Sequence, residues 1–347
     1  MNSSSFPNHS TLIPIKRINR YVLFREIGRG AIGTVFYGHD PVIDREVAVK
    51  IFHHLPSALE NKQRDQLFMN EARAAGRLSH PSIITIYDAA SEGNRCFIAM
   101  EYLHGKDLRH YLDNRKAFDF VTIAHMFQRI AEGLDYAHRE GVTHRDIKPA
   151  NIFIQDNMRP KLLDFGIARA LKRDNDPNAE DAATLFHNNI LGTPNYMSPE
   201  QALARPVTNL TDIYSLGVVL YEMLTHQKPF QANTIDGLSQ MIVHKQPKAP
   251  HEINPAIPIT LSRIVLRAMS KQTNKRFQTA KEMANELKRF VVTEKKERRS
   301  ERNKLTSLSN PVDNDAEHQH KRLFWLSCIA ILLAAAVTAN AFLSKIR

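Results

Sequence analysis

The 347-residue chain is long enough for one large or two ordinary domains, and its content of 43% hydrophobic and 24% charged residues is that of a globular protein. The formal net charge of +11 would suit nucleic acid or an anionic lipid surface. No zinc-finger spacing, RNA-binding motif or basic stripe interleaved with aromatic residues is present, so nucleic-acid binding is disfavoured. Residues 1–20 form an N-terminal tail without an apolar core of signal-peptide length, and we expect this end to stay in the cytosol.

Three runs rich in β-branched and aromatic residues, bounded by glycines, begin at Tyr21 and predict antiparallel strands. Gly28, Gly30 and Gly33 form the pattern G-x-G-x-x-G, which dinucleotide-binding folds share. In those folds a helix opens at the glycines, whereas residues 34–37 of this chain continue as strand. The glycines therefore favour a loop that covers nucleotide phosphates. The three runs are YVLFREIGRG, AIGTVFYGHD and REVAVKIF.

The last of these strands carries Lys50 among apolar residues. A lysine is seldom fully buried without an anionic partner, so we expect Lys50 to pair with phosphates. Residues 66–78 have apolar side chains at helical spacing and include Glu71, which is either a solvated carboxylate or a partner of Lys50. Two further strands, over residues 82–88 and 96–100, would complete a small sheet.

The pattern turns helical in the second part of the chain. Residues 121–139 form a long amphipathic helix that stops at Gly141, a typical C-terminal signal. Short strands are predicted over residues 153–154 and 161–163. They flank the loop that follows the helix.

That loop is the densest cluster of reactive side chains: HRDIKPAN, with DFG a short distance after it. Two carboxylates, a lysine and a carboxamide within about twenty residues meet the needs of phosphoryl transfer, in which the protein supplies positioning and charge neutralisation. Asp146 is placed to accept the proton of an attacking hydroxyl, and Lys148 to neutralise the transferring group. Asn151 and Asp164 offer the oxygen ligands that Mg²⁺ prefers. For either motif alone, a polar turn between strands is the alternative.

Together, HRDIKPAN and DFG resemble the catalytic and metal-binding loops of eukaryotic-type (Hanks-type) serine/threonine protein kinases, as found in bacteria. A lysine two residues after the aspartate, as Lys148 follows Asp146, resembles the pattern of serine/threonine kinases rather than that of tyrosine kinases. The resemblance covers about residues 21–290 and implies an α+β fold of two lobes, a small antiparallel β lobe with one main helix (21–103) and a larger, mainly helical lobe (104–290). It also implies ATP and Mg²⁺, with Mn²⁺ as a substitute, and Ser or Thr hydroxyls of proteins as acceptors.

The same resemblance implies an ATP site in the small lobe. Lys50 would contact the α and β phosphates and pair with Glu71. Met100 would be the gatekeeper residue behind the adenine, although a core methionine in a buried strand fits the position equally well. Backbone groups of Glu101 and Leu103 would meet the polar edge of the adenine. The full set of implied ATP contacts is Ile27, Gly28, Gly30, Gly33, Val35, Ala48, Lys50, Met100, Glu101 and Leu103.

The stretch after DFG is polar and has no hydrophobic period, which predicts a mobile loop. Its end, GTPNYMSPE, resembles the GT...APE segment of kinases, with Ser198 where alanine is usual. The resemblance places Thr193 beside the acceptor hydroxyl. Arg145 is the natural receptor for a phosphate on this loop, with Thr184 as the first candidate and Thr193 as the second.

Three later residues are structural in this resemblance. Glu200 would pair with Arg276. Asp212 lies near the start of a buried helix predicted over residues 212–223. It would either cap that helix or accept hydrogen bonds from the backbone of the catalytic loop.

The C-terminal part has a different character. Residues 291–322 form a charged juxtamembrane linker with little capacity for a core. The run from Leu323 to Leu343 contains 21 residues and no charge; at ~1.5 Å per residue it spans about 31 Å, which matches a bilayer core of roughly 30 Å. We expect a single transmembrane helix rather than a buried terminal helix. The kinase domain would then be cytoplasmic and the short tail, residues 344–347, would lie on the far side of the membrane.

The sequence thus predicts a membrane-anchored signalling kinase, with a homodimer as one route to trans-autophosphorylation. A pseudokinase scaffold, which binds nucleotide or partners without phosphoryl transfer, is the main alternative. Inactive relatives usually lose one of five residues that are all present here: Lys50, Glu71, Asp146, Asn151 and Asp164. A small-molecule kinase of similar fold is a second alternative. The GTPNYMSPE segment argues against it, because that element builds a platform for peptide substrates.

Overall fold

The computed structural model describes residues 13–30, 33–52, 61–92, 95–165, 194–309, 321–327 and 329. The chain divides into two compact units, Met1–Val291 and Val292–Arg347. Both predicted lobes lie in the first unit, and so does the site that the sequence predicts.

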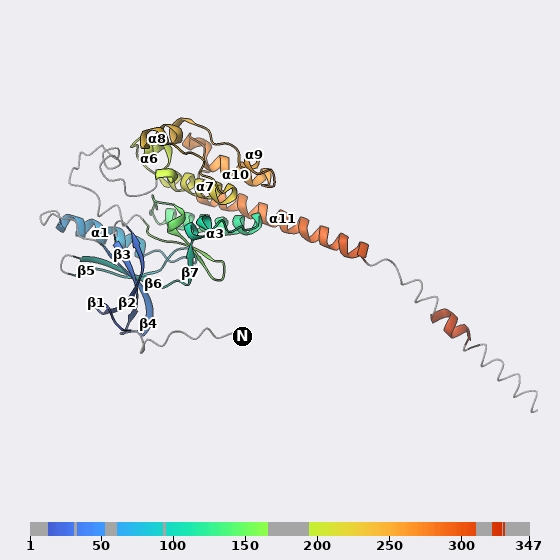
Figure 1. Cartoon of the computed structure of the whole chain (residues 1–347), viewed down its shortest axis with the longest axis horizontal. Coiled ribbons are helices and arrows are strands. Elements are labelled where there is room, and N and C mark those ends of the chain that lie inside the picture. The colour runs from blue at the N-terminus through green and yellow to red at the C-terminus, as the bar shows by residue number, and fades with distance from the viewer. Residues whose placement is uncertain are drawn as a thin grey trace, which may run out of the picture. The chain divides into compact units, whose positions relative to one another are not determined.

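The first lobe is built on an antiparallel sheet of six described strands in the order β1-β2-β3-β4-β6-β5 (Figure 1). Apolar side chains cover both faces because alternate residues point to opposite sides. Val47, Val49 and Phe97 belong to one buried cluster, and Ala48 and Met100 to another. The strands are β1 (Lys16–Ile18), β2 (Tyr21–Gly30), β3 (Gly33–Asp40), β4 (Arg45–Phe52), β5 (Ile86–Glu92) and β6 (Arg95–Glu101).

One helix, α1 (Asn61–Gly76), packs against this sheet. The ring of Phe68 in α1 meets the ring of Phe52 in β4 edge-on, with 5.2 Å between the centroids. The sheet differs from the prediction in two places. Strand β1 lies within the predicted N-terminal tail and pairs with β2. Strand β5 begins four residues later than predicted, because the N–H of Ile83 donates to the carbonyl of His80 and closes a turn.

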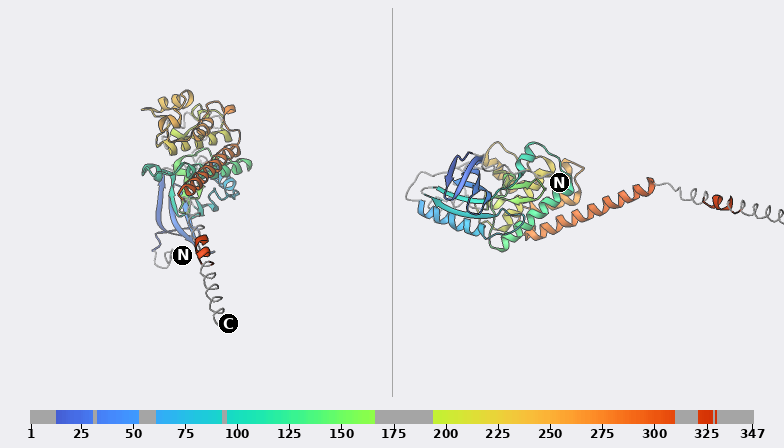
Figure 2. Two further views of the ribbon diagram at one scale, coloured as in Figure 1. Left: turned by 90° about the vertical axis from the view of Figure 1, so that its right-hand side faces the viewer. Right: turned by 90° about the horizontal axis from the view of Figure 1, so that it is seen from below.

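The second lobe is mainly helical. Figure 2 shows its yellow and orange helices on one side and the blue strands of the first lobe on the other. A small antiparallel sheet of described strands, in the order β7-β8-β9, lies in this lobe. The strands are β7 (Gly105–Asp107), β8 (Ile152–Gln155) and β9 (Pro160–Leu162). The helices are α2 (Leu108–Asp113), α3 (Phe120–Arg139), α6 (Pro199–Ala202), α7 (Asn209–Thr225), α8 (Ile235–His244), α9 (Pro250–Ile253), α10 (Ile259–Ala268) and α11 (Ala280–Ser309), with the 3₁₀ turns η2 (Pro149–Asn151), η3 (Pro194–Tyr196) and η4 (Thr273–Lys275).

Helices α3 and α7 form the centre of this lobe. The carboxylate of Asp119 accepts two backbone N–H groups and caps the start of α3. The helix ends shortly before Gly141, whose φ of 76° suits glycine, as the sequence predicts. Residues 211–225 of α7 are buried, so this helix is enclosed on every side, as expected for a helix at the centre of a lobe. These two helices hold the loop that carries the predicted catalytic residues.

The last long helix, α11, crosses the boundary between the two units. The predicted linker of residues 291–322 therefore begins as helix, and its side chains at 295–303 are exposed. Of the predicted span from Leu323 to Leu343, the structure describes 323–327 and 329 as helical, and the rest lies outside the described residues. Within the part of the chain that the structure describes, no helix has the length and apolar character needed to cross a bilayer.

Candidate active site

The carboxylate of Asp212 on helix α7 holds the backbone of the catalytic loop in place. Asp212 is fully buried and accepts the backbone N–H groups of His144 at 2.8 Å and Arg145 at 2.7 Å. Its Oδ2 also lies 2.8 Å from Nε2 of His138 on α3. Helix α7 is capped by Thr208 instead, so Asp212 does not cap it. These bonds fix the backbone immediately before Asp146.

The predicted base and its neighbours form one polar group. Lys148 Nζ donates to Oδ2 of Asp146 at 2.7 Å, and Nδ2 of Asn151 donates to the same oxygen at 3.0 Å. The amide of Asn151 also donates to the backbone carbonyl of Asp146 at 2.8 Å. The side chain of Asp146 is 46% exposed, so a substrate hydroxyl can reach it. Its carboxylate is thus oriented by two donors and open on one side.

A second carboxylate, Asp164, lies between the two lobes. Its Oδ2 accepts a hydrogen bond from Lys50 Nζ at 2.6 Å. Burial acts to raise the pKa of Asp164, but the charge and hydrogen bond of Lys50 prevail and hold that pKa below its ordinary value. Asp164 is therefore ionised at neutral pH. Glu71 lies half-buried on α1, and its pairing with Lys50 stays a prediction.

The predicted adenine site has an apolar wall. Ala48 of β4 pairs directly with Met100 of β6, and Val35 and Leu103 pack on the same cluster. Ile27 is partly exposed on β2. These side chains form the surface on which the sequence places the adenine.

The predicted glycines lie on β2 and β3. Gly28 pairs with Val35 and Gly30 with Gly33 across the two strands. At Gly33 a Cβ would lie 2.6 Å from the carbonyl oxygen of Ile51, so only glycine fits this close approach of β3 to β4. The turn between the strands, residues 31–32, lies outside the described residues.

Glu101 makes a contact that the sequence analysis missed. Its carboxylate accepts from Lys161 Nζ on β9 at 2.6 Å and from the backbone N–H of Thr85 at 2.7 Å. The end of β6 is thus tied to the second lobe by a charge-assisted bond. A signal was present, because Lys161 is a cation on a short, otherwise apolar strand.

Phe165, the phenylalanine of the DFG motif, packs beside the site. Phe165 is buried, and its ring lies 4.6 Å from the ring of His144, between centroids. A small cavity in front of it is lined in part by Lys50, Met100 and Asp164. Phe165 thereby connects the catalytic loop with the wall of the predicted nucleotide site.

Arg145 has a strained backbone and a partly unsatisfied side chain. Its φ of 65° lies in the left-handed region, which a non-glycine residue occupies only at a cost of order 1–3 kcal/mol. Its buried Nε has no hydrogen-bond partner among the described residues. The two candidate phosphorylation sites, Thr184 and Thr193, lie outside the described residues.

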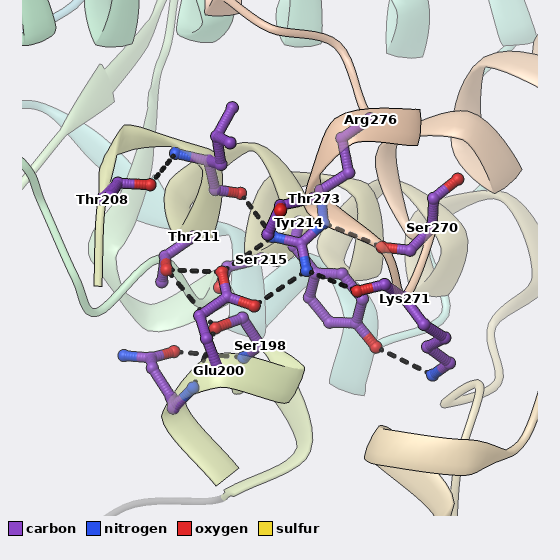
Figure 3. Close-up of polar contacts among 12 residues, drawn as sticks. Ser198, Glu200, Thr208, Thr211, Tyr214, Ser215, Ser270, Lys271, Thr273 and Arg276 are labelled. Atoms are coloured by element: carbon purple, nitrogen blue, oxygen red, sulfur yellow. Dashed lines mark hydrogen bonds and ion pairs between the residues drawn. The ribbon is translucent and has the colours of Figure 1, made fainter. Parts of the chain in front are cut away.

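Glu200 and Arg276 form a buried bidentate pair, with 2.7 Å and 2.8 Å between their atoms (Figure 3). Burial acts to raise the pKa of Glu200, but the guanidinium outweighs it and holds that pKa below its ordinary value. Arg276 is 1% exposed and also donates to three backbone carbonyls. Those carbonyls belong to Ser270, Leu210 and Lys271.

Ser198 shows why serine suits a position where alanine is usual. Its Oγ accepts from the N–H of Gln201, and the Gln201 side chain accepts from the N–H of Ser198, which makes a capping box for α6. The Gln201 amide also donates to the carbonyl of Arg145 at 3.0 Å. The GTPNYMSPE segment, through the turn that it begins, and the catalytic loop are therefore joined.

A network around Glu222 of α7 was not predicted. Tyr196 donates its hydroxyl hydrogen to Oε2 of Glu222 at 2.6 Å, and Arg109 lies 3.3 Å from Oε1. Burial, together with the bond to Glu222, raises the pKa of Tyr196, so the phenol stays a donor. Tyr196 belongs to GTPNYMSPE, but its partners are far away in the sequence and no local pattern marks them.

The site can be compared with known proteins. A model of the protein kinase domain family matches residues 21–308 of the chain. The chain belongs to the protein kinase domain family. The kinase match therefore includes strands β2 to β6 of the sheet, the catalytic loop, helix α7 and all of α11 except its last residue.

Named relatives agree with this membership. The kinase chain is 37% identical over 269 residues to a probable serine/threonine-protein kinase of Clostridium acetobutylicum, covering 78% of this chain and 39% of the relative. It is 35% identical over 277 residues to the serine/threonine-protein kinase PrkC of Bacillus subtilis, covering 79% and 41%. The kinase chain thus spans about two fifths of the length of these relatives.

Solved structures show the same fold. The kinase domain of PknI from Mycobacterium tuberculosis superposes with a TM-score of 0.62 at 24% sequence identity, covering 80% of this chain and 99% of that one. The two-lobed protein kinase fold predicted from the motifs is confirmed.

Proposed function

We propose that this chain is a serine/threonine protein kinase that transfers the γ-phosphoryl group of ATP to hydroxyl groups of proteins, its own among them. The observation that carries the proposal is the group around Asp146: an exposed carboxylate held by Lys148 and Asn151, on a loop fixed by Asp212. A pseudokinase has no need of this arrangement. Relatives named as serine/threonine-protein kinases support the choice of acceptor.

The residues present suit ATP with a divalent cation, Mg²⁺ or Mn²⁺. Asn151 uses its Nδ2 on Asp146, which leaves its carbonyl oxygen available as a ligand. Asp164 is ionised and adds a carboxylate. Two hard oxygen ligands from the protein suit Mg²⁺ when phosphates and water supply the others. When bound, the cation neutralises charge on the phosphates, and Lys50 adds a positive charge beside it.

The chain's own residues then have defined tasks. Asp146 accepts the hydrogen bond of the acceptor hydroxyl and takes its proton as the oxygen attacks the γ-phosphorus. The bond from that phosphorus to the bridging oxygen breaks, and ADP leaves. Lys148 lies against Asp146, where its positive charge would offset the charge that develops on the transferring group.

The test compares binding with transfer in the purified wild-type protein. ATP labelled in the γ position is supplied with Mg²⁺ and a generic basic protein, and nucleotide affinity is measured by calorimetry. The proposal predicts both ATP binding and label on serine or threonine, identified after acid hydrolysis. Binding of ATP without any transfer would favour the pseudokinase alternative. Label on a small molecule alone would favour a small-molecule kinase.

A membrane anchor is part of the proposal. The uncharged run from Leu323 to Leu343 supports it, as does the basic run from Lys295 to Lys304, whose described side chains are exposed on α11. Near an anionic lipid surface, each lysine or arginine contributes up to about 1 kcal/mol to the free energy of binding. The catalytic lobes would then lie on the cytoplasmic side, where ATP is available.

A further inference from the structure

The segment that joins the two lobes is held from outside by an aromatic cluster that no kinase motif describes. This segment, residues 101–104, begins at the last residue of β6 and contains the backbone predicted to meet the adenine. We call the following six residues the hinge cluster: Phe24, Arg25, Tyr37, Glu46, Tyr102 and His104.

Tyr102 lies at the centre of the hinge cluster. Its ring is 4.8 Å from the ring of Tyr37 on β3 and 4.9 Å from the ring of His104, between centroids. The ring of Phe24 on β2 lies 5.9 Å from the ring of Tyr37, between centroids. Aromatic rings at these separations attract one another beyond the gain from burial. Tyr102 is thereby fastened to two strands of the small lobe.

Polar contacts close the same cluster. Nη2 of Arg25 donates to the hydroxyl of Tyr102 at 3.1 Å, and the guanidinium lies over the Tyr37 ring at 5.2 Å. The hydroxyl of Tyr37 donates to Glu46 on β4 at 2.5 Å. Burial, followed by this bond, raises the pKa of Tyr37, so the phenol remains protonated and a donor at neutral pH. Three strands and the hinge are therefore connected.

The hinge also contacts the wall of the predicted nucleotide site, because Tyr102 and Leu103 both pack against the cluster of Ala48 and Met100. Leu103, next to Tyr102, packs with Val35 and Ala48 on the predicted adenine wall. The backbone groups of Glu101 and Leu103 that would bond the adenine flank Tyr102 directly. Holding the Tyr102 side chain therefore limits the freedom of both groups.

The hinge cluster also lies at the base of the glycine hairpin. Arg25 and Tyr37 are direct partners in the β2–β3 register, and Gly28 follows on the same strand. The contacts that hold the hinge thus also hold the two strands leading to the phosphate loop. Preorganising both halves of a binding site lowers the entropy lost on binding.

We propose that Tyr102 is a positioning residue for ATP, which sets nucleotide affinity by fixing the hinge backbone against β2 and β3. The inference rests on the proposed function. Because Tyr102 stands away from the transferring group, its loss should act on binding and leave the chemical step alone.

The experiment uses the full chain with Tyr102→Ala and Tyr102→Phe. ATP affinity is measured by calorimetry, and KM and kcat by transfer to a generic protein. Tyr102→Ala should raise Kd and KM for ATP about five- to twentyfold, with kcat changed by no more than about twofold. Tyr102→Phe keeps the ring and loses only the bond from Arg25, so its Kd should rise about threefold or less.

The matched control is Tyr111→Ala. Tyr111 packs edge-on against Phe118 at 5.5 Å in the second lobe, so its loss removes a comparable aromatic contact away from the nucleotide. This variant should bind ATP as the wild type does. If Tyr102→Ala does not fold, Tyr102→Leu, which keeps apolar volume without a ring, replaces it.

The outcomes separate the two proposals. If the wild type binds ATP and neither Tyr102→Ala nor Tyr102→Leu changes its Kd, the positioning role is overturned while the kinase function stands. An equal loss of affinity in Tyr111→Ala would also overturn it, because the effect would then be general destabilisation. A fall in kcat at unchanged KM would overturn it as well. A wild type without ATP binding would refute the proposed function and this inference together.

Discussion

Arg145 combines a left-handed backbone, a buried Nε without a hydrogen-bond partner among the described residues, and a position next to the predicted base Asp146. Asp212 and Gln201 hold the two peptide groups that flank Arg145: Asp212 accepts from the N–H of Arg145, and Gln201 donates to its carbonyl. The Arg145 side chain therefore keeps at least one N–H group, at Nε, available to donate a hydrogen bond. A phosphate accepts several such bonds, so phosphorylation of the neighbouring loop would satisfy this cation.

We therefore predict that Thr184 is phosphorylated in the active protein. Thr184→Ala should lower the rate of substrate phosphorylation about tenfold or more, because Arg145 loses its anion and the loop loses its order. Mass spectrometry of active protein locates the phosphate, with Thr193 as the second candidate.

Arg145→Met provides the control. If the phosphate acts through Arg145, the double variant should be as slow as either single variant. An unmodified loop in active protein, together with full activity of Thr184→Ala, would rule this regulation out.

Residues in consecutive motifs were predictable, and residues joined across the fold were not. HRDIKPAN and DFG predict four side chains, Asp146, Lys148, Asn151 and Asp164, because phosphoryl transfer requires these types at this spacing. Lys161 and Arg109 escaped prediction because each meets its partner, Glu101 or Glu222, only after folding. Tyr102 escaped it for the same reason. A lone tyrosine in a sequence says nothing about the strands on which it packs.

At the scale of elements, Arg276 connects helices α6 and α7 with the segment that follows α10. It bonds Glu200 of α6, a carbonyl in the first turn of α7 and two carbonyls after α10. The elements themselves were largely predictable from periodicity, including α1, α3 and α7. Short elements such as β1 and α9 were not, because a few residues carry too weak a pattern.

We predict that Arg276→Met destabilises the protein by about 3–5 kcal/mol, since it leaves the carboxylate of Glu200 buried without its cation. The free energy of unfolding in urea is the measurement. Lys275→Met, at the exposed neighbour, should stay within about 0.5 kcal/mol of the wild type. A loss below about 1 kcal/mol in Arg276→Met would show that the pair does not connect these elements.

The same pair has a signature in pH. The folded-state pKa of Glu200 lies below the ordinary value of 4.5, so the unfolded chain binds more protons as pH falls below 4.5. The stability contributed by the pair is therefore complete above that pH and is lost as pH falls toward the lower folded pKa. In Arg276→Met this part of the acid sensitivity should be absent from unfolding curves recorded at several pH values.

At the scale of the whole molecule, composition divides the chain into a kinase domain and a C-terminal part of a different kind. The kinase match ends at residue 308, inside α11, so the helix belongs to both parts. What lies beyond could be predicted only from hydropathy and charge. A long apolar run has few alternatives to a bilayer or a core.

Fractionation tests the proposed anchor. Full-length protein should remain in the membrane pellet after an alkaline wash, because an uncharged helix of bilayer length is not held by charge. A variant that ends at His320 should become soluble and stay an active kinase. Release of the full-length protein by the wash would show that the run from Leu323 to Leu343 does not span the membrane.

The most direct test of the account is the rate of transfer to protein by Asp146→Asn at saturating ATP and Mg²⁺. Asparagine keeps the size and the contacts to Lys148 and Asn151 but cannot accept the hydroxyl proton. We predict a rate lower by about 10² to 10⁴ with nearly unchanged ATP affinity, and loss of productive Mg²⁺ binding in the parallel variant Asp164→Asn. Unaltered transfer in both variants would contradict the assignment of this loop as the catalytic site.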